Sequence, residues 1–506
     1  MTQKIRIYLI SALLVILHSP VSGQPADSIS TARKAQAAEI VRAVASDPAF
    51  SQSVLSICVC TGDGERLASL NPDMMLVPAS NMKLITTGAA IHTLGKDRRF
   101  ETQLAYKGEI RNGTLYGDLY IIGKGDPTLG SRDSTAVPVE QTFARWGRYV
   151  EEAGIRKIDG HIVGDGRWFD GMNEEESWVW NDIGTYYGTG CSALMFYENI
   201  QAFNVLPGKN PGDPVDITPY YPAAPWMEFR YECSTGEKGT GDRLYMYTSD
   251  LAPVAAIRGT FGVDRGRKRV ECSNKFPEYT CASYFTDWLR KKGVECTKGP
   301  ADFKLKPGPS DIDSGKELTY IGTTRSVELK RIIYTTNHES NNLYAETLFR
   351  VLGKEMSGSA TYGSSAKALE RALQTLGVDT SKGIHIKDGS GLSRQNYASS
   401  DFFCRFLEAM MHSPAFEEYA HSLPSPGSNG TLEFNMRGYP EELRSRIKVK
   451  SGSMNGIRCY SGYIIPTTGA KDETIIFSIL TGNCTSPNWK TRPLLDKLMA
   501  GLAEIN

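Results

Sequence analysis

Residues 77–90 read VPASNMKLITTGAA, and this stretch decides how the rest of the chain is interpreted. Its apolar and small side chains predict a helix from about Ser80 to Leu94 that ends at Gly95. Ser80 and Lys83 share one face of that helix, because side chains three positions apart are neighbours, with Cβ atoms about 5–6 Å apart. A lysine whose pKa falls through burial could take the proton of the serine. The pair is therefore either a nucleophile with its base or the first turn of a core helix.

The serine-x-x-lysine pattern alone does not decide between these readings. It occurs again at Ser364 to Lys367 and at Ser445 to Lys448. At most one of the three matches is expected to be catalytic.

Two downstream segments distinguish the first match from the others. Ser340, Asn341 and Asn342 stand at the start of an apolar helix, and Lys450, Ser451 and Gly452 lie on a predicted strand. Each segment is weak evidence alone, since serine-x-asparagine recurs at 453–455 and 486–488. Ser340 could be a helix cap and Lys450 a solvated strand residue. The order of the three motifs is nevertheless the one found in penicillin-recognising serine acyltransferases.

Composition limits the classes of partner. The chain has 506 residues with 57 basic and 57 acidic side chains, so net charge gives no reason to expect nucleic acid as a partner. The length exceeds that of a single core, which predicts two or three domains. Since 40% of the residues are hydrophobic, each domain can bury a core. We expect no nucleic-acid partner.

The N-terminus predicts export. A basic start, an eleven-residue apolar run and small residues before Gly23 are typical of a signal peptide over residues 1–23. We therefore expect a periplasmic protein with at most peripheral membrane contact, and the leucine-bearing final helix is expected to pack in a core. The ten cysteines would then lie where disulfides form, and we expect some of them to pair. The chain has no C-x-x-C, so no metal site is predicted.

The order of elements predicts an α+β, multi-domain fold. Two strand-like runs near residues 51–70 and three between 446 and 482 suggest one antiparallel five-stranded sheet covered by helices. Between them, residues 100–277 are rich in glycine, tyrosine and short alternating runs, which indicates an inserted β-rich region. Three sequential domains remain the alternative.

The motifs together resemble the low-molecular-mass, class C penicillin-binding proteins. The runs GKGDPTLGS (123–131), WNDIGTYYGTGCSAL (180–194) and KDGSGLSRQN (387–396) are similar to family landmarks in family order. The resemblance implies a β-lactamase/transpeptidase-like catalytic domain split over residues 24–99 and 278–506, with two nested domains within 100–277. It implies serine D-Ala-D-Ala carboxypeptidase and endopeptidase activity on peptidoglycan peptides, with β-lactam antibiotics as covalent inhibitors and no cofactor.

The resemblance also implies residue roles. Ser80 is the expected nucleophile and Lys83 its base, and the backbone N–H groups of Ser80 and Ser453 are expected to hold the oxyanion. Ser340 and Lys450 are expected to protonate the leaving amine, and Lys450 to depress the pKa of Lys83. Asn342 is expected to orient the peptide. The remaining expected substrate-binding residues are Ser451, Gly452, Ser453 and Arg394. Serine replaces the commoner threonine at 451 and keeps a hydroxyl for the substrate carboxylate. Arg394 could instead be a structural arginine that orders the DGSG loop with Asp388.

Other functions fit less well. The chain has neither the G-x-S-x-G of an α/β-hydrolase nor the H-E-x-x-H of a metalloprotease. None of its seven histidines lies in a recognisable triad motif, and His338 is expected to be structural. A β-lactamase is the nearest enzymatic alternative, and a non-catalytic peptidoglycan-binding scaffold is the non-enzymatic one.

Overall fold

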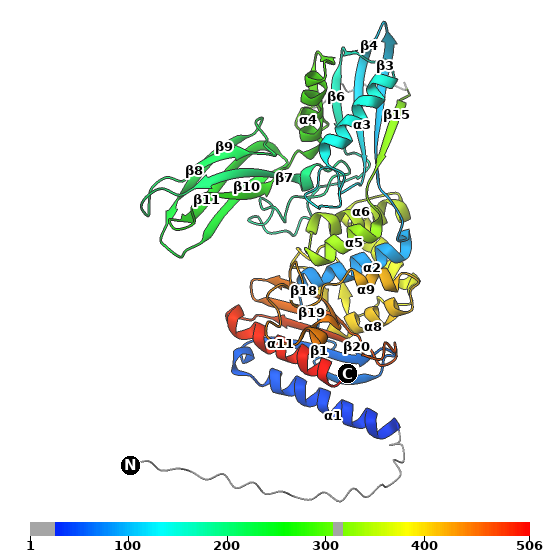
Figure 1. Cartoon of the computed structure of the whole chain (residues 1–506), viewed down its shortest axis with the longest axis vertical. Coiled ribbons are helices and arrows are strands. Elements are labelled where there is room, and N and C mark those ends of the chain that lie inside the picture. The colour runs from blue at the N-terminus through cyan, green and yellow to red at the C-terminus, as the bar shows by residue number, and fades with distance from the viewer. Residues whose placement is uncertain (1–25, 307–316) are drawn as a thin grey trace, which may run out of the picture.

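The computed structural model describes residues 26–306 and 317–506. The signal peptide predicted at residues 1–23 lies outside them. The described chain forms a domain built on a five-stranded sheet at one end and an inserted region at the other (Figure 1).

One antiparallel five-stranded sheet is built from both ends of the chain. Its strands, in spatial order, are β18 (Ile447–Met454), β19 (Ile457–Ile464), β20 (Ile475–Gly482), β1 (Val54–Thr61) and β2 (Arg66–Leu70). Strand β1 alternates between two cores, because Ile57 and Val59 face one apolar cluster and Cys58 and Cys60 face the other. The predicted sheet is therefore confirmed.

Helices cover both faces of this sheet. Helices α1 (Ala26–Ala45) and α11 (Asn488–Glu504) pack on one face, where Leu495, Leu498 and Leu502 are buried. The other face carries α2 (Met82–Leu94), α5 (Leu329–His338), α6 (Asn342–Ser357), α7 (Tyr362–Thr375), α8 (Ser400–Met411) and α9 (Phe416–His421). The short α10 (Glu441–Ser445) precedes β18, and β16 (Ile384–His385) pairs with β17 (Tyr397–Ala398). The final helix is thus a core helix, as predicted.

Helix α2 is the central element of this domain. Every residue from Met82 to Ile91 is buried, because α5, α6, α7 and α9 all contact α2. A 3₁₀ turn, Ala79–Asn81, precedes it, and Gly95 ends it with its N–H on the carbonyl of Ile91. The predicted helix and its C-cap are confirmed.

The inserted region contains a seven-stranded sheet. Its order is β13 (Glu295–Cys296), β5 (Lys157–Ile158), β4 (Thr114–Lys124), β3 (Glu101–Arg111) and β15 (Thr319–Arg325), and β6 (His161–Asp165) pairs with β4 and with β14 (Gly299–Ala301). Helices α3 (Val139–Glu152) and α4 (Pro277–Lys291) share its core, where Trp146 packs edge-on against Phe285.

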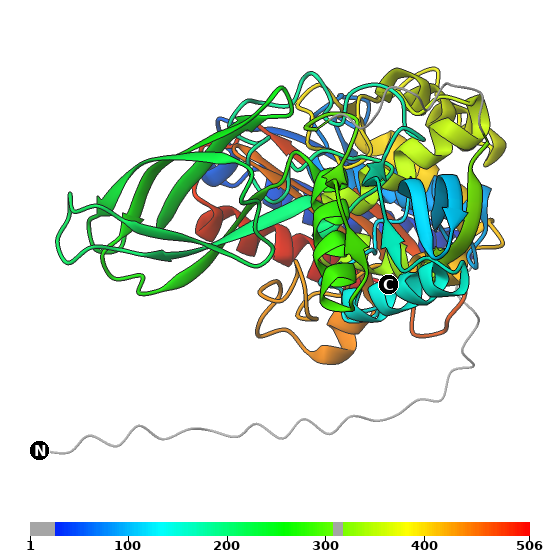
Figure 2. The same ribbon diagram turned by 90° about the horizontal axis from the view of Figure 1, so that it is seen from above.

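Six further strands interrupt this unit between β6 and α4. They form two three-stranded sheets, β12–β7–β8 and β10–β11–β9, and they project to one side of the molecule (Figure 2). Their bounds are β7 (Ile200–Leu206), β8 (Asp216–Tyr220), β9 (Glu228–Gly236), β10 (Asp242–Ser249), β11 (Ala252–Gly262) and β12 (Lys268–Ser273). Their own apolar cluster includes Phe203, Met246 and Phe261.

The second boundary of the insert lies later than the sequence analysis placed it. Residues 278–325 were assigned to the catalytic domain, yet β15 pairs with β3, and α4 buries Cys281, Phe285 and Leu289 in the core of the insert. The assignment followed the return of helical periodicity at residue 278. A helix can cover either sheet, so periodicity does not mark the border between domains.

The cysteines differ from expectation as well. All ten are unpaired, and nine are buried. Most lie inside the apolar clusters, where an isolated thiol behaves as a small hydrophobic side chain. Within the described ranges, no helix is both long and apolar enough to cross a membrane.

Candidate active site

Three distant segments meet above the five-stranded sheet. Ser80 and Lys83 come from the start of α2, Ser340 and Asn342 from the start of α6, and Lys450 from β18. Contacts of α2 with α6, and of the 3₁₀ turn Ala79–Asn81 with β18, bring the segments together. The residues predicted from the three motifs therefore form one site.

Lys83 is the centre of this site. Its Nζ lies 3.1 Å from Ser80 Oγ and 2.6 Å from Asn342 Oδ1, and it donates to the carbonyl of Ser390 at 2.7 Å. These contacts hold the amine beside the serine hydroxyl. The distance from Nζ to Oγ is within reach of a direct proton transfer.

Burial lowers the pKa of the Lys83 amine. The Lys83 side chain is fully buried, and the loss of solvation lowers its pKa from 10.5 to about 7, against the opposing charges of Asp388 and Glu346. Burial and the charge of Asp388 in turn raise the pKa of Glu346 to about 8. Half of the Lys83 amines are then neutral near pH 7, as a general base requires.

A second buried lysine contacts the serine of α6. Lys450 Nζ lies 3.0 Å from Ser340 Oγ and donates to the carbonyl of Ser451 at 2.9 Å. Burial first, and then the charge of Lys83, hold the pKa of Lys450 well below the usual lysine range. Burial is thus the main cause of the lowered pKa at both lysines. The expected lowering of the Lys83 pKa by Lys450 stays a prediction.

The Lys-Ser-Gly motif lies on an edge strand. Among the described strands, β18 pairs with β19 alone, and Ser453 of this edge strand lines the cleft. Ser453 is exposed and Ser451 half-buried, and the buried Gly452 alternates between them. A Cβ on Gly452 would lie 2.6 Å from the carbonyl oxygen of Pro78, so glycine permits the close approach of β18 to the 3₁₀ turn that carries Ser80.

Two residues beside the motifs have left-handed backbone. Ala79 (φ 46°) precedes the nucleophile candidate, and Ser340 has φ 56°. Such conformations cost about 1–3 kcal/mol each and persist where packing enforces them. They place the hydroxyls of Ser80 and Ser340 in the same cleft.

A cleft of about 1250 Å³ contains the site. Ser80, Ser340, Asn342, Arg394 and Ser453 line it. The inserted region supplies much of the opposite wall, with Arg132, Asp133, Ser134, Asn181, Asp182, Tyr186, Tyr187, Glu198 and Tyr245. The insert is therefore part of the cleft.

Arg394 is exposed in this cleft, as a substrate-binding role requires. The carboxylate of Asp388 instead accepts from the backbone N–H groups of Gly391 and Ser393 and from the side chains of Trp178 and Asn396. These donors, rather than Arg394, order the DGSG loop.

Sequence reasoning missed three contributors to the site. The Ser390 carbonyl binds Lys83, the Tyr187 carbonyl accepts from Asn342 Nδ2 at 2.9 Å, and Glu198 accepts from Asn341 Nδ2 at 2.9 Å. Two of the three are backbone atoms, which leave no residue-type signal. All three lie in or beside the family-like runs at 180–194 and 387–396.

The other motif matches lie elsewhere. Ser364 is in the first turn of α7, where it donates its N–H to Thr361, and Ser445 ends α10. His338 stacks on Tyr334 with ring centroids 3.9 Å apart, and burial lowers its pKa to about 4. A stacked, neutral imidazole agrees with the structural role expected for it.

One group of thiols could hold a soft metal ion. The Sγ atoms of Cys58, Cys60 and Cys404 lie within 4.8 Å of one another, where β1 meets α8. None of the three lines the active-site cleft. The chemistry of the cleft rests on the serine, lysine and asparagine side chains.

The fold and this constellation define the class of the protein, a serine peptidase of the penicillin-binding type. Residues 37–500 match the model of the D-Ala-D-Ala carboxypeptidase 3 (S13) family. The chain therefore belongs to that family.

Relatives and solved structures agree with this membership. The chain is 30% identical to a D-alanyl-D-alanine carboxypeptidase of Actinomadura sp. (strain R39), over 90% of this chain and 83% of the relative. It is 25% identical to the D-alanyl-D-alanine carboxypeptidase DacB of Haemophilus influenzae, over 81% of each protein. The crystal structure of penicillin binding protein 4 from Haemophilus influenzae superposes with a TM-score of 0.75 at 21% identity, covering 90% of this chain and 96% of that one. The last comparison supports the shared fold.

Proposed function

We propose that the protein hydrolyses peptidoglycan peptides ending in D-Ala-D-Ala, and peptide cross-links, through a Ser80 acyl-enzyme. The observation that carries this proposal is the buried Lys83 amine, with a pKa of about 7, held between Ser80 Oγ and Asn342 Oδ1. β-Lactams would acylate the same serine, and a β-lactam complex exists for the Haemophilus influenzae protein of the same fold.

Acylation begins at Ser80. Neutral Lys83 accepts the hydroxyl proton while Oγ attacks the carbonyl carbon of the penultimate D-alanine. The backbone N–H groups of Ser80 and Ser453 stabilise the oxyanion, and one such donor contributes about 10²–10³-fold in rate. The C–N bond then breaks and D-alanine leaves.

The leaving amine takes its proton through Ser340. Ser340 Oγ hands its proton to the nitrogen and is reprotonated from the lysine network, in which Lys450 Nζ contacts it directly. Water then attacks the acyl carbon while Lys83 accepts its proton. The bond from that carbon to Ser80 Oγ breaks, the proton returns from Lys83 to Oγ, and the product acid leaves. In a cross-link, the leaving amine is that of the neighbouring peptide.

The remaining side chains bind the peptide. The Asn342 side chain donates its second Nδ2 hydrogen to an amide carbonyl of the substrate peptide and so orients the peptide. The hydroxyls of Ser451 and Ser453, beside Gly452, bind the terminal carboxylate of the substrate. Arg394 lines the pocket for the free end of the substrate side chain, and its exposure in the cleft supports that role.

The proposed location is the periplasm. Its support is the signal-peptide pattern of residues 1–23 in the sequence.

The test is mass spectrometry of the protein after incubation with penicillin. We expect one adduct on Ser80, and Ser80→Ala should abolish both the adduct and the release of D-alanine. Ser364→Ala, at another serine-x-x-lysine match, is the matched control and should retain both. Persistent labelling of Ser80→Ala would exclude Ser80 as the nucleophile. Rapid penicillin turnover without peptide hydrolysis would favour the β-lactamase alternative, and no adduct at all would favour the scaffold.

A further inference from the structure

A loop of the inserted region reaches the proposed catalytic centre. Asp182, Tyr186 and Tyr187 of loop 182–190 line the cleft, and the carbonyl of Tyr187 accepts from Asn342 Nδ2 at 2.9 Å. The oxygen of the same amide accepts from Lys83 at 2.6 Å. The Tyr187 carbonyl therefore fixes which end of the Asn342 amide faces the lysine.

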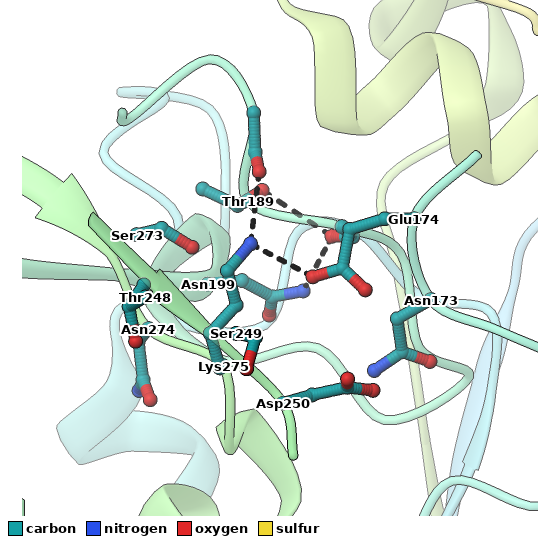
Figure 3. Close-up of polar contacts among 12 residues, drawn as sticks. Asn173, Glu174, Thr189, Asn199, Thr248, Ser249, Asp250, Ser273, Asn274 and Lys275 are labelled. Atoms are coloured by element: carbon teal, nitrogen blue, oxygen red, sulfur yellow. Dashed lines mark hydrogen bonds and ion pairs between the residues drawn. The ribbon is translucent and has the colours of Figure 1, made fainter. Parts of the chain in front are cut away.

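Three carbonyls of this loop are anchored by buried donors. The carbonyl of Gly184 accepts from the Ser273 N–H at 2.9 Å, that of Gly188 from Lys275 Nζ at 3.0 Å, and that of Gly190 from Asn199 Nδ2 at 3.1 Å. Figure 3 shows Lys275, Asn199 and Thr189 gathered at this point. The anchors come from the end of β12 and the turn before β7.

Lys275 is an unusual anchor. Its side chain is fully buried and forms an ion pair of 2.7 Å with Glu174, which Figure 3 shows beside it. Burial lowers the pKa of Lys275 and the charge of Glu174 opposes that change. A buried charge is costly unless it is paired and hydrogen-bonded, and here the remaining bond goes to the residue that follows Tyr187.

The loop has little room to adapt without this anchor. A Cβ on Gly188 would lie 2.1 Å from the carbonyl oxygen of Asp182, so the two ends of the turn are in close contact. The Gly188 N–H donates to Thr185, and the Tyr187 hydroxyl donates to Asp182. A shift at Gly188 is therefore transmitted to Tyr187.

We propose that Lys275, paired with Glu174, is a positioning residue for the reaction. It holds loop 182–190 so that the Tyr187 carbonyl keeps the Asn342 amide oriented toward Lys83. The inference rests on the proposed function and gives the inserted region a part in assembling the catalytic centre.

The test is a double-mutant cycle on the rate of acylation by penicillin. Lys275→Met combined with Glu174→Gln removes the anchor without leaving a buried charge unpaired. We expect acylation to fall about 10- to 100-fold, the cost of misplacing a catalytic group by about 1 Å. In an Asn342→Ala background the same pair should cost less than about twofold, because the anchored group is gone.

The matched control is Arg258→Met, which removes an ion pair of the same length, 2.7 Å to Glu232, from the same unit. It should leave acylation unchanged. Equal losses in both backgrounds, or no loss in a folded double variant, would overturn the inference. Neither result would touch the proposed function, whose failure would appear as missing Ser80 labelling in the unaltered protein.

A second measurement tests the inference on the unaltered protein, for the case that the double variant does not fold. Hydrogen exchange of the unaltered protein should show slow exchange at the hydrogen-bonded amides of Thr185, Gly188 and Cys191. Exchange there as fast as in a free loop would mean that the loop is not held, and the inference would be wrong.

Discussion

The ionisation of Lys83 gives the sharpest prediction. An amine with a pKa of 10.5 is neutral in about one molecule in 3000 at pH 7, whereas a pKa of about 7 makes half of the molecules neutral. Burial thus increases the neutral base roughly 1500-fold, equivalent to about 4 kcal/mol. Since deprotonation activates the base, the rate of acylation should rise with pH through about 7.

The assay is the second-order rate constant for labelling by a fluorescent penicillin, measured between about pH 5 and 9. We expect a tenfold loss for each pH unit below 7. Lys83→Ala should lose this acid limb and about 10³-fold in rate. Circular dichroism should show an unchanged fold.

Two results would refute the reasoning. A rate that still rises tenfold per pH unit up to about pH 9 would mean that Lys83 keeps an ordinary pKa. Persistence of the acid limb in Lys83→Ala would mean that another group is the base.

Three further predictions concern residues that contact or support the site. Lys450→Met should slow acylation about 10- to 100-fold, since Ser340 loses its buried partner, and the same labelling assay measures it. Gly391→Ala should impair labelling through displacement of the nucleophile turn, because its Cβ would lie 1.9 Å from the Ala79 oxygen at a φ of +84°. Phe403→Ala should cost about 3–5 kcal/mol of unfolding free energy in urea titration, because the ring is fully buried between α8 and the sheet. Normal labelling by the first two variants, or a loss below about 1 kcal/mol in the third, would contradict these assignments.

The catalytic domain could be predicted well because its patterns are local. The apolar run after Ser80 specifies a buried helix, and the alternation in β1 sends Ile57 and Cys58 to opposite cores. The side chains of the site were predictable since their chemistry depends on residue type. The order of the three motifs along the chain predicted the site, which no single motif could do.

The parts that sequence reasoning missed depend on contacts between distant segments. Ser390 and Tyr187 act through backbone carbonyls, which every residue possesses. Strand β15 pairs with β3 across more than 200 residues, so nothing local marks it as part of the insert. The pKa of Lys83 likewise depends on the positions of Asp388 and Glu346, which no local pattern shows.

The charged groups near Lys83 and Lys450 distinguish the roles of the two lysines in the proposed reaction. Asp388 and Glu346 oppose the desolvation of Lys83 and leave its pKa near 7, whereas Lys450 has only burial and the charge of Lys83, both of which lower its pKa. Both effects therefore disfavour a charge on Lys450. When Lys83 accepts the proton of Ser80, the charge of Asp388 stabilises the new ammonium, and Lys450 stays in contact with Ser340. The buried carboxyl groups thus make the α2 lysine, rather than the β18 lysine, the base in the proposed reaction.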